Sequence, residues 1–121
     1  MITHLKFASI PVSDQARALE FYTQKLGFRV VTDQQFDEQQ RWIELRIGNS
    51  QTRIVLFTPE GHEDRIGGFL PGSFACDDVA ATYRQLRQRG VEFVSEPKQE
   101  PWGTFAIMKD PDGNQFVVGS G

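Results

Sequence analysis

The sequence of 121 residues contains a single cysteine, so the chain can form neither an internal disulfide nor a cysteine-rich zinc site. It has no apolar run near the roughly 20 residues that a membrane span needs, and no cationic start followed by an apolar stretch. Positive charge is scarce as well, since 13 Lys and Arg stand against 16 Asp and Glu and give a net charge of −3. These absences predict a cytoplasmic protein whose partners are neither membranes nor nucleic acids.

The residues that are present suit one folded domain. Hydrophobic residues make up 39% of the chain and charged residues 24%, which is typical of a soluble globular protein. Because domains usually contain roughly 100–150 residues, residues 1–121 are predicted to form a single domain without help from disulfides or metals.

The same order of signals occurs twice along the chain. Each half begins with a strand, an acidic helix cap, a helix with an apolar stripe and a glycine that ends it, and continues with three strands. The cap and the glycine are Asp14 and Gly27 in the first half, and Asp78 and Gly90 in the second. The predicted strands are residues 7–12, 28–32, 42–47, 53–57, 73–76, 91–94, 105–108 and 115–118.

This repeat predicts two βαβββ modules in tandem. Module one covers about 1–58, a polar connector covers about 59–69, and module two covers about 70–121. In each module a curved sheet would carry its helix on the convex face and leave the concave face bare. The predicted fold class is therefore α+β, with a curved mixed sheet around a cleft and the helices on the outer face.

Four short segments of the sequence resemble the vicinal-oxygen-chelate superfamily, which contains glyoxalase I, extradiol dioxygenases and bleomycin-resistance proteins. These segments are residues 10–14 (IPVSD), 21–22 (FY), 26–28 (LGF) and 109–114 (KDPDGN). The resemblance covers essentially the whole chain. It implies paired βαβββ modules, a ligand cavity inside the curved sheet and a homodimer.

The resemblance also implies where a metal would be held. In metal-dependent members the ligands occupy four strand positions, which correspond here to Phe7, Val55, Pro71 and Val117. None of these side chains has a donor atom for a metal, and the two histidines have no partner at metal-binding spacing. We therefore expect no metal, and the sequence indicates no other cofactor.

If the positions that the resemblance implies point into the cleft, Phe7 among them, alternation along the strands predicts which side chains line it. They are Phe7, Ser9, Arg53, Val55, Phe57, Ser73, Gln115 and Val117. The lining would be mostly apolar with a few polar groups, which is typical of a small-molecule pocket. Among those groups, Arg53 is expected to anchor an anionic or carbonyl group of the ligand. The alternative is that the apolar members fill a core and leave no pocket.

Three aromatic residues and one acid complete the candidate binding site. Phe36, Trp42 and Trp102 could form a wall on which a planar or cationic ligand stacks, or they could serve packing alone. Glu44 could be a charged partner inside the cleft, or could lie on a solvated face.

These residues favour a metal-independent small-molecule-binding protein, similar to the bleomycin-resistance branch, that sequesters an aromatic or cationic compound. No catalytic residue is identified, so binding is favoured over enzymatic turnover. One alternative is a metal-dependent lyase, isomerase or dioxygenase whose ligands are not located. Another is an interaction module whose cleft is filled by its own side chains.

Overall fold

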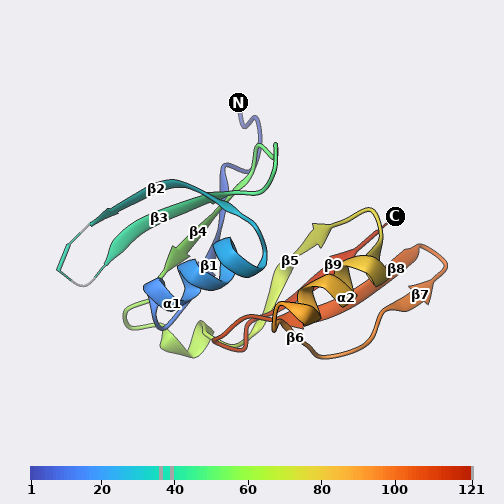
Figure 1. Ribbon diagram of the computed structural model, residues 1–121. Helices are drawn as coiled ribbons and strands as arrows, with labels where there is room; N and C mark the ends of the chain where they lie inside the picture. The colour runs from blue at the N-terminus through green and yellow to red at the C-terminus, as the bar shows by residue number, and fades with distance from the viewer. Residues whose placement is uncertain (36, 39, 121) are drawn as a thin grey trace. The chain divides into compact units, whose positions relative to one another are not determined.

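The computed structural model describes residues 1–35, 37–38 and 40–120 of the chain (Figure 1). It divides into two compact units, Met1–Ile66 and Gly67–Gly121. Each unit contains one mixed sheet and one capped helix, so the predicted α+β fold is confirmed. None of the helices that the structure describes is both long and apolar enough to cross a membrane.

The first unit is built on a four-stranded sheet in the order β1-β4-β3-β2. Strand β1 pairs in parallel with β4, and the other two pairings are antiparallel. A bulge interrupts the pairing of β2 with β3 between Val30 and Thr32. The bounds of the strands are Phe7–Pro11 for β1, Arg29–Gln35 for β2, Arg41–Arg46 for β3 and Arg53–Phe57 for β4.

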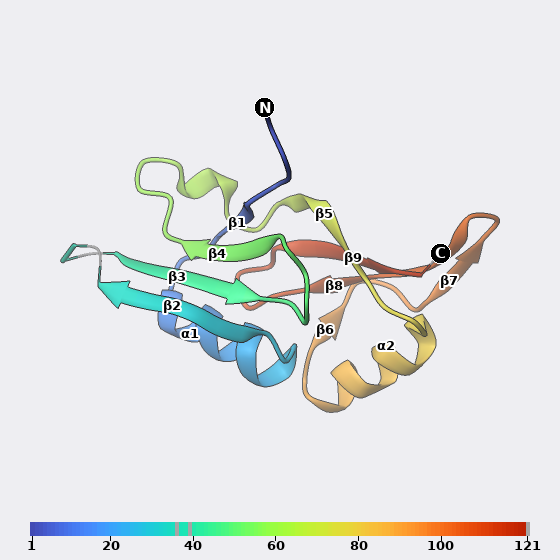
Figure 2. The same cartoon turned by 90° about the horizontal axis from the view of Figure 1, so that it is seen from above.

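Helix α1 (Gln15–Glu20) runs along one face of this sheet and continues into a π-helical turn η1 (Phe21–Lys25; Figure 2). Asp14 caps α1, because its carboxylate accepts a hydrogen bond from the backbone N–H of Arg17 at 3.0 Å. Gly27, at φ 82°, occupies the left-handed conformation in which the helical segment ends. The capped helix predicted between these two residues is thus present.

The core of the first unit lies between α1 and the sheet. Alternate strand residues on the helix side are buried together with apolar residues of α1 and η1: Ile10, Ala18, Phe21, Tyr22, Ile43, Leu45, Ile54 and Leu56. The buried side chain of Gln15 attaches the helix to two strands. Its amide donates to the carbonyls of Arg41 and Leu56 and its oxygen accepts from the N–H of Arg41, at 2.7–3.0 Å. The helix therefore has a fixed position over one face only.

The second unit repeats this plan. Its sheet has the order β5-β9-β8-β6, with β7 paired to the other part of β8, and β5 is parallel to β9. Asp78 caps α2 (Val79–Gln88) by accepting from the N–H of Ala81, and Gly90 at φ 88° follows the helix. The strand bounds are Phe69–Ala75 for β5, Glu92–Phe93 for β6, Lys98–Glu100 for β7, Gly103–Lys109 for β8 and Gln115–Gly119 for β9.

Two local features were not predicted from the sequence. Strand β7 consists of the polar residues Lys98–Glu100 and follows no apolar alternation. The connector after β4 contains a one-turn 3₁₀ helix, η2 (Glu63–Arg65). The repeat itself is present, while the packing of both modules into one domain stays a prediction.

The turn between β8 and β9 is held by two buried side chains. One carboxylate oxygen of Asp110 accepts from the backbone N–H groups of Asp112 and Asn114, and the other accepts from the amide of Asn114 at 2.8 Å. The amide oxygen of Asn114 in turn accepts from the N–H of Gly67. The segment that resembles the superfamily at this turn therefore has a structural role.

The matched helix caps give a test of the repeat. We expect Asp14→Ala and Asp78→Ala each to lower the free energy of unfolding by about 1 kcal/mol, because each leaves a backbone N–H at a helix start without its acceptor. Urea denaturation followed by circular dichroism measures both losses. Asp77→Ala is the matched control, since Asp77 is exposed and precedes the cap. An equal loss for Asp77→Ala and Asp78→Ala would contradict the assignment of the cap.

Candidate functional site

The face of the first sheet opposite α1 carries seven of the predicted site residues. We call it the open face. Cα partners on neighbouring strands point to the same side of a sheet, and the register pairs Phe7 with Arg53, Ser9 with Val55, and Val55 with Glu44. Alternation adds two more residues to this face, Phe57 on β4 and Trp42 on β3.

A cavity of about 250 Å³ opens on this face. The rings of Phe7 and Trp42 meet edge to face beside it, with their centroids 5.6 Å apart and their planes at 82°. Val55 is buried, whereas Phe7 is half-buried and Trp42 is exposed. The lining residues are Phe7, Ser9, Gln40, Arg41, Trp42, Val55, Leu56 and Phe57.

Next to the cavity, Glu44 forms an ion pair across two strands. Its Oε2 accepts from Nη1 of Arg53 at 2.7 Å, and its Oε1 accepts from the indole N–H of Trp42 at 3.2 Å. The Glu44 side chain is 13% exposed and that of Arg53 is 32% exposed. Glu44 is therefore a charged partner on the open face, and its two oxygens hold the arginine and the indole in place.

This environment favours the ionised form of Glu44. The hydrogen bond from Arg53 lowers the pKa of the Glu44 carboxyl below its ordinary value, against the opposing effect of burial, and the bond from Trp42 and the charges of Arg53 and Lys6 lower it further. At neutral pH the carboxylate and the guanidinium are both charged and neutralise one another.

The second unit brings together three other predicted residues. Ser73 is the register partner of Val117, and both line a cavity of about 390 Å³. The other lining residues are Phe74, Ala75, Trp102, Gly119 and Ser120. Trp102 is 63% exposed and stacks on Phe105 with ring centroids 5.4 Å apart. Gln115 lies two residues before Val117, on the same face of β9, but does not line this cavity.

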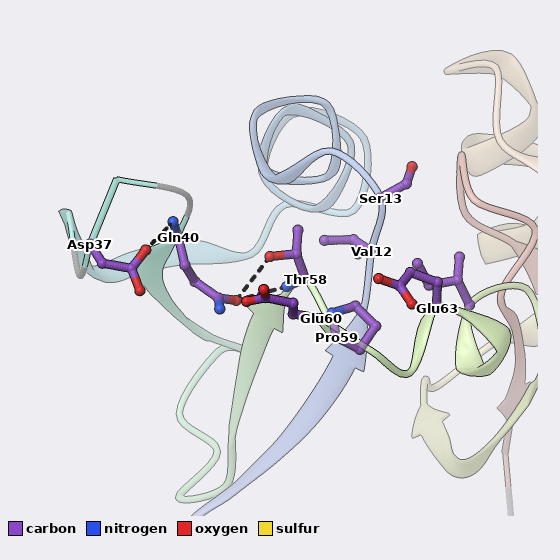
Figure 3. Close-up of a pocket in the computed structure, with 9 residues that line it drawn as sticks. Val12, Ser13, Asp37, Gln40, Thr58, Pro59, Glu60 and Glu63 are labelled. Carbon is purple, nitrogen blue, oxygen red and sulfur yellow. Dashed lines mark hydrogen bonds between the residues drawn. The ribbon is translucent and has the colours of Figure 1, made fainter.

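A third cavity, of about 510 Å³, was not predicted from the sequence (Figure 3). Gln40 crosses one side of it, where its side-chain oxygen accepts from the N–H and hydroxyl of Thr58 and its backbone N–H donates to Asp37. Backbone N–H groups of Glu63 and Gly61 hold the pKa of the Glu63 carboxyl below its usual range. The lining residues are Val12, Ser13, Asp37, Gln40, Thr58, Pro59, Glu60, Glu63 and Ile66.

Comparison with known proteins assigns the family. The family model of the Glyoxalase/Bleomycin resistance protein/Dioxygenase superfamily matches residues 2–118. The chain belongs to this superfamily.

Several known proteins are similar to this chain over nearly their full length. A crystal structure of a member from Sphaerobacter thermophilus DSM 20745 is 36% identical, with a TM-score of 0.89, and the match covers 99% of this chain and 98% of that one. TnmS3, an antibiotic binding protein from Streptomyces sp. CB03234, is 34% identical, with a TM-score of 0.82 and coverage of 98% and 96%. The uncharacterized protein YetH of Bacillus subtilis strain 168 is 34% identical, with 98% of both chains covered.

The four positions that the resemblance implies for a metal carry no side-chain ligand. Phe7 lies in β1, Val55 in β4, Pro71 in β5 and Val117 in β9, and none of these residue types supplies a side-chain donor. Among the residues that the structure describes, no three His, Cys, Asp or Glu side chains form a group that could hold a metal ion. The remaining predicted site residue, Phe36, lies outside the described residues.

The ion pair on the open face predicts a pH dependence of stability. Because the folded-state pKa of Glu44 is lowered, its contribution to stability is present above the ordinary range of a glutamate and is lost as the pH falls through the folded-state value. Wild type should thus lose stability more steeply than Glu44→Gln between about pH 5 and pH 3.

Urea denaturation of both proteins at a series of pH values measures this difference. Glu20→Gln, which removes one exposed carboxylate from α1, is the matched control and should follow wild type. If Glu44→Gln instead runs parallel to wild type over this range, the ion pair does not stabilise the folded state.

Proposed function

We propose that this chain is a metal-independent small-molecule-binding protein that holds an aromatic compound on the open face of its first sheet. The observation that carries the proposal is the 250 Å³ cavity beside the crossed rings of Phe7 and Trp42. Aromatic ligands pack well in edge-to-face or offset arrangements against such rings.

The composition and size of this cavity support a small ligand. Its lining combines apolar and aromatic side chains with few polar groups, as small-molecule sites do. Its volume is just below the roughly 300–1,000 Å³ of typical ligand pockets, so one or two rings suit it better than a large molecule. The similarity to TnmS3, described as an antibiotic binding protein, supports small-molecule binding as well.

The residue types at the four inherited metal positions support binding without a metal. Aliphatic, aromatic and proline side chains cannot coordinate Zn²⁺, Ni²⁺, Mn²⁺ or Fe²⁺, so they offer nothing to a divalent ion at that place. We propose that the cavity of the second unit, with Ser73, Trp102 and Val117 on its lining and Gln115 nearby, is a candidate ligand-contact surface of that unit. Phe36 stays a candidate for the aromatic wall.

Binding of 2-naphthamide, a neutral two-ring probe, tests this proposal. We expect saturable one-to-one binding without turnover, measured by titration calorimetry and unchanged after dialysis against a chelator. Trp42→Ala should weaken it by about tenfold through the loss of an aromatic contact and its buried area, while Trp42→Phe should retain most of the affinity.

Elemental analysis of the same samples tests metal independence directly. Stoichiometric zinc, nickel, manganese or iron, with binding lost on chelation, would contradict metal-independent binding. Equal affinities of wild type and Trp42→Ala would contradict the placement of the ligand.

We also propose that the chain forms a homodimer. Strand β2 is an edge of the first sheet, and two of its apolar side chains, Val30 and Val31, are 48% and 40% exposed, so this edge is left uncovered. Light scattering should give about twice the chain mass of 13.8 kDa. A monomer mass at micromolar concentration would contradict the dimer.

A further inference from the structure

Three arginines lie side by side across the open face of the first sheet. Arg29 on β2 is the register partner of Arg46 on β3, and Arg46 is the register partner of Arg53 on β4. We call these residues the arginine row. Residues directly opposite on neighbouring strands have Cβ atoms only about 4.5–5.5 Å apart, and like charges placed there destabilise a sheet. The arginine row is therefore expected to lower the stability of the ligand-free protein.

The arginine row ends next to the aromatic cavity. Arg53 is paired on its other side with Phe7, whose ring stands against Trp42 beside the cavity. Arg46 lies two residues after Glu44 on β3, which places both side chains on the same face. A ligand whose ring enters the cavity thus has Arg53 on the strand next to Phe7, and Arg46 on the strand after that.

Few negative charges on this face balance the row. Glu44 is the only acidic residue that the register and alternation of the four strands place on the open face, and Arg53 and Trp42 already engage its oxygens. Within the described part of the chain, the side chains of Arg29 and Arg46 make no hydrogen bond or ion pair, and the Arg53 side chain bonds to Glu44. Three positive charges against one make this face cationic, although the whole chain has a net charge of −3.

We propose that the arginine row is an anion-recognition subsite, and that the ligand of the open face is a planar aromatic acid. Its ring occupies the cavity beside Phe7 and Trp42, and its carboxylate lies over Arg46 and Arg53. This inference rests on the proposed function for the position of the ring. Guanidinium groups bind carboxylates through paired hydrogen bonds, and an anion at this place offsets the repulsion within the row. A cationic ligand would meet the same row with its only carboxylate already engaged.

Two probes of the same shape and different charge test the subsite. By titration calorimetry at low ionic strength, 2-naphthoate should bind wild type about fivefold more tightly than neutral 2-naphthamide, a ratio at the upper end for an exposed ion pair. The preference should shrink as salt is added. In the Arg29→Gln/Arg46→Gln double variant, 2-naphthoate should lose about fivefold, while 2-naphthamide stays within about twofold of wild type.

The control variant is Arg17→Gln, which removes one positive charge from α1 on the covered side of the same sheet and should leave both affinities unchanged. The melting temperature of the double variant should equal or exceed that of wild type, because repulsion within the row is relieved. Equal affinities of wild type for the two probes, or tighter binding of 2-naphthylmethylammonium, would overturn the subsite and leave the aromatic cavity in place. Failure of every probe to bind would overturn the proposed function and the subsite with it.

Discussion

One helix can cover only one face of a four-stranded sheet, and this constraint organises the first unit. The covered face buries the side chains of Ile10, Ile43, Leu45, Ile54 and Leu56. Gln15 holds the helix over this face through three hydrogen bonds to the strand backbone. The face that the helix leaves open can therefore carry residues that a core excludes. The exposed indole, the paired carboxylate and the arginines all lie there, beside a cavity instead of inside a core.

The sequence was sufficient for those parts of the fold that depend on local signals. Asp14 and Asp78 each accept a hydrogen bond from an N–H group at the start of a helix. Gly27 and Gly90 have the positive φ at which each helical segment ends. These four residues therefore predicted the positions of both helices from the sequence. Strand β7 was missed because its residues are polar and its pairing with β8 is the only reason for its extended shape. Its partner strand, which is apolar and alternating, was found.

The same distinction applies to the candidate site, where some features could be predicted from the sequence and others depend on how the strands align. The positions that the resemblance implies for Phe7 and Val55, together with alternation along each strand, were enough to group Phe7, Ser9, Arg53 and Val55 on one face. The pairing of Glu44 with Arg53 depends on how β3 and β4 align, which no local signal determines, so the sequence left the environment of Glu44 open. The 510 Å³ cavity was beyond prediction for a similar reason, since its lining combines the β2–β3 turn with the connector after β4.

The bulge in β2 has a consequence for how this surface can change in evolution. Val30 and Thr32 pair with the adjacent residues Leu45 and Glu44, so one extra residue in β2 reverses the alternation at that point. This reversal is what puts Arg29 on the same side as Thr32, three positions away. Because Val31 is the extra residue of the bulge, loss of its codon would give a regular strand in which Arg29 still faces Arg46 and Thr32 still faces Glu44. The length of this edge strand can therefore change at Val31 without changing the charge on the open face or the side chains of the cavity.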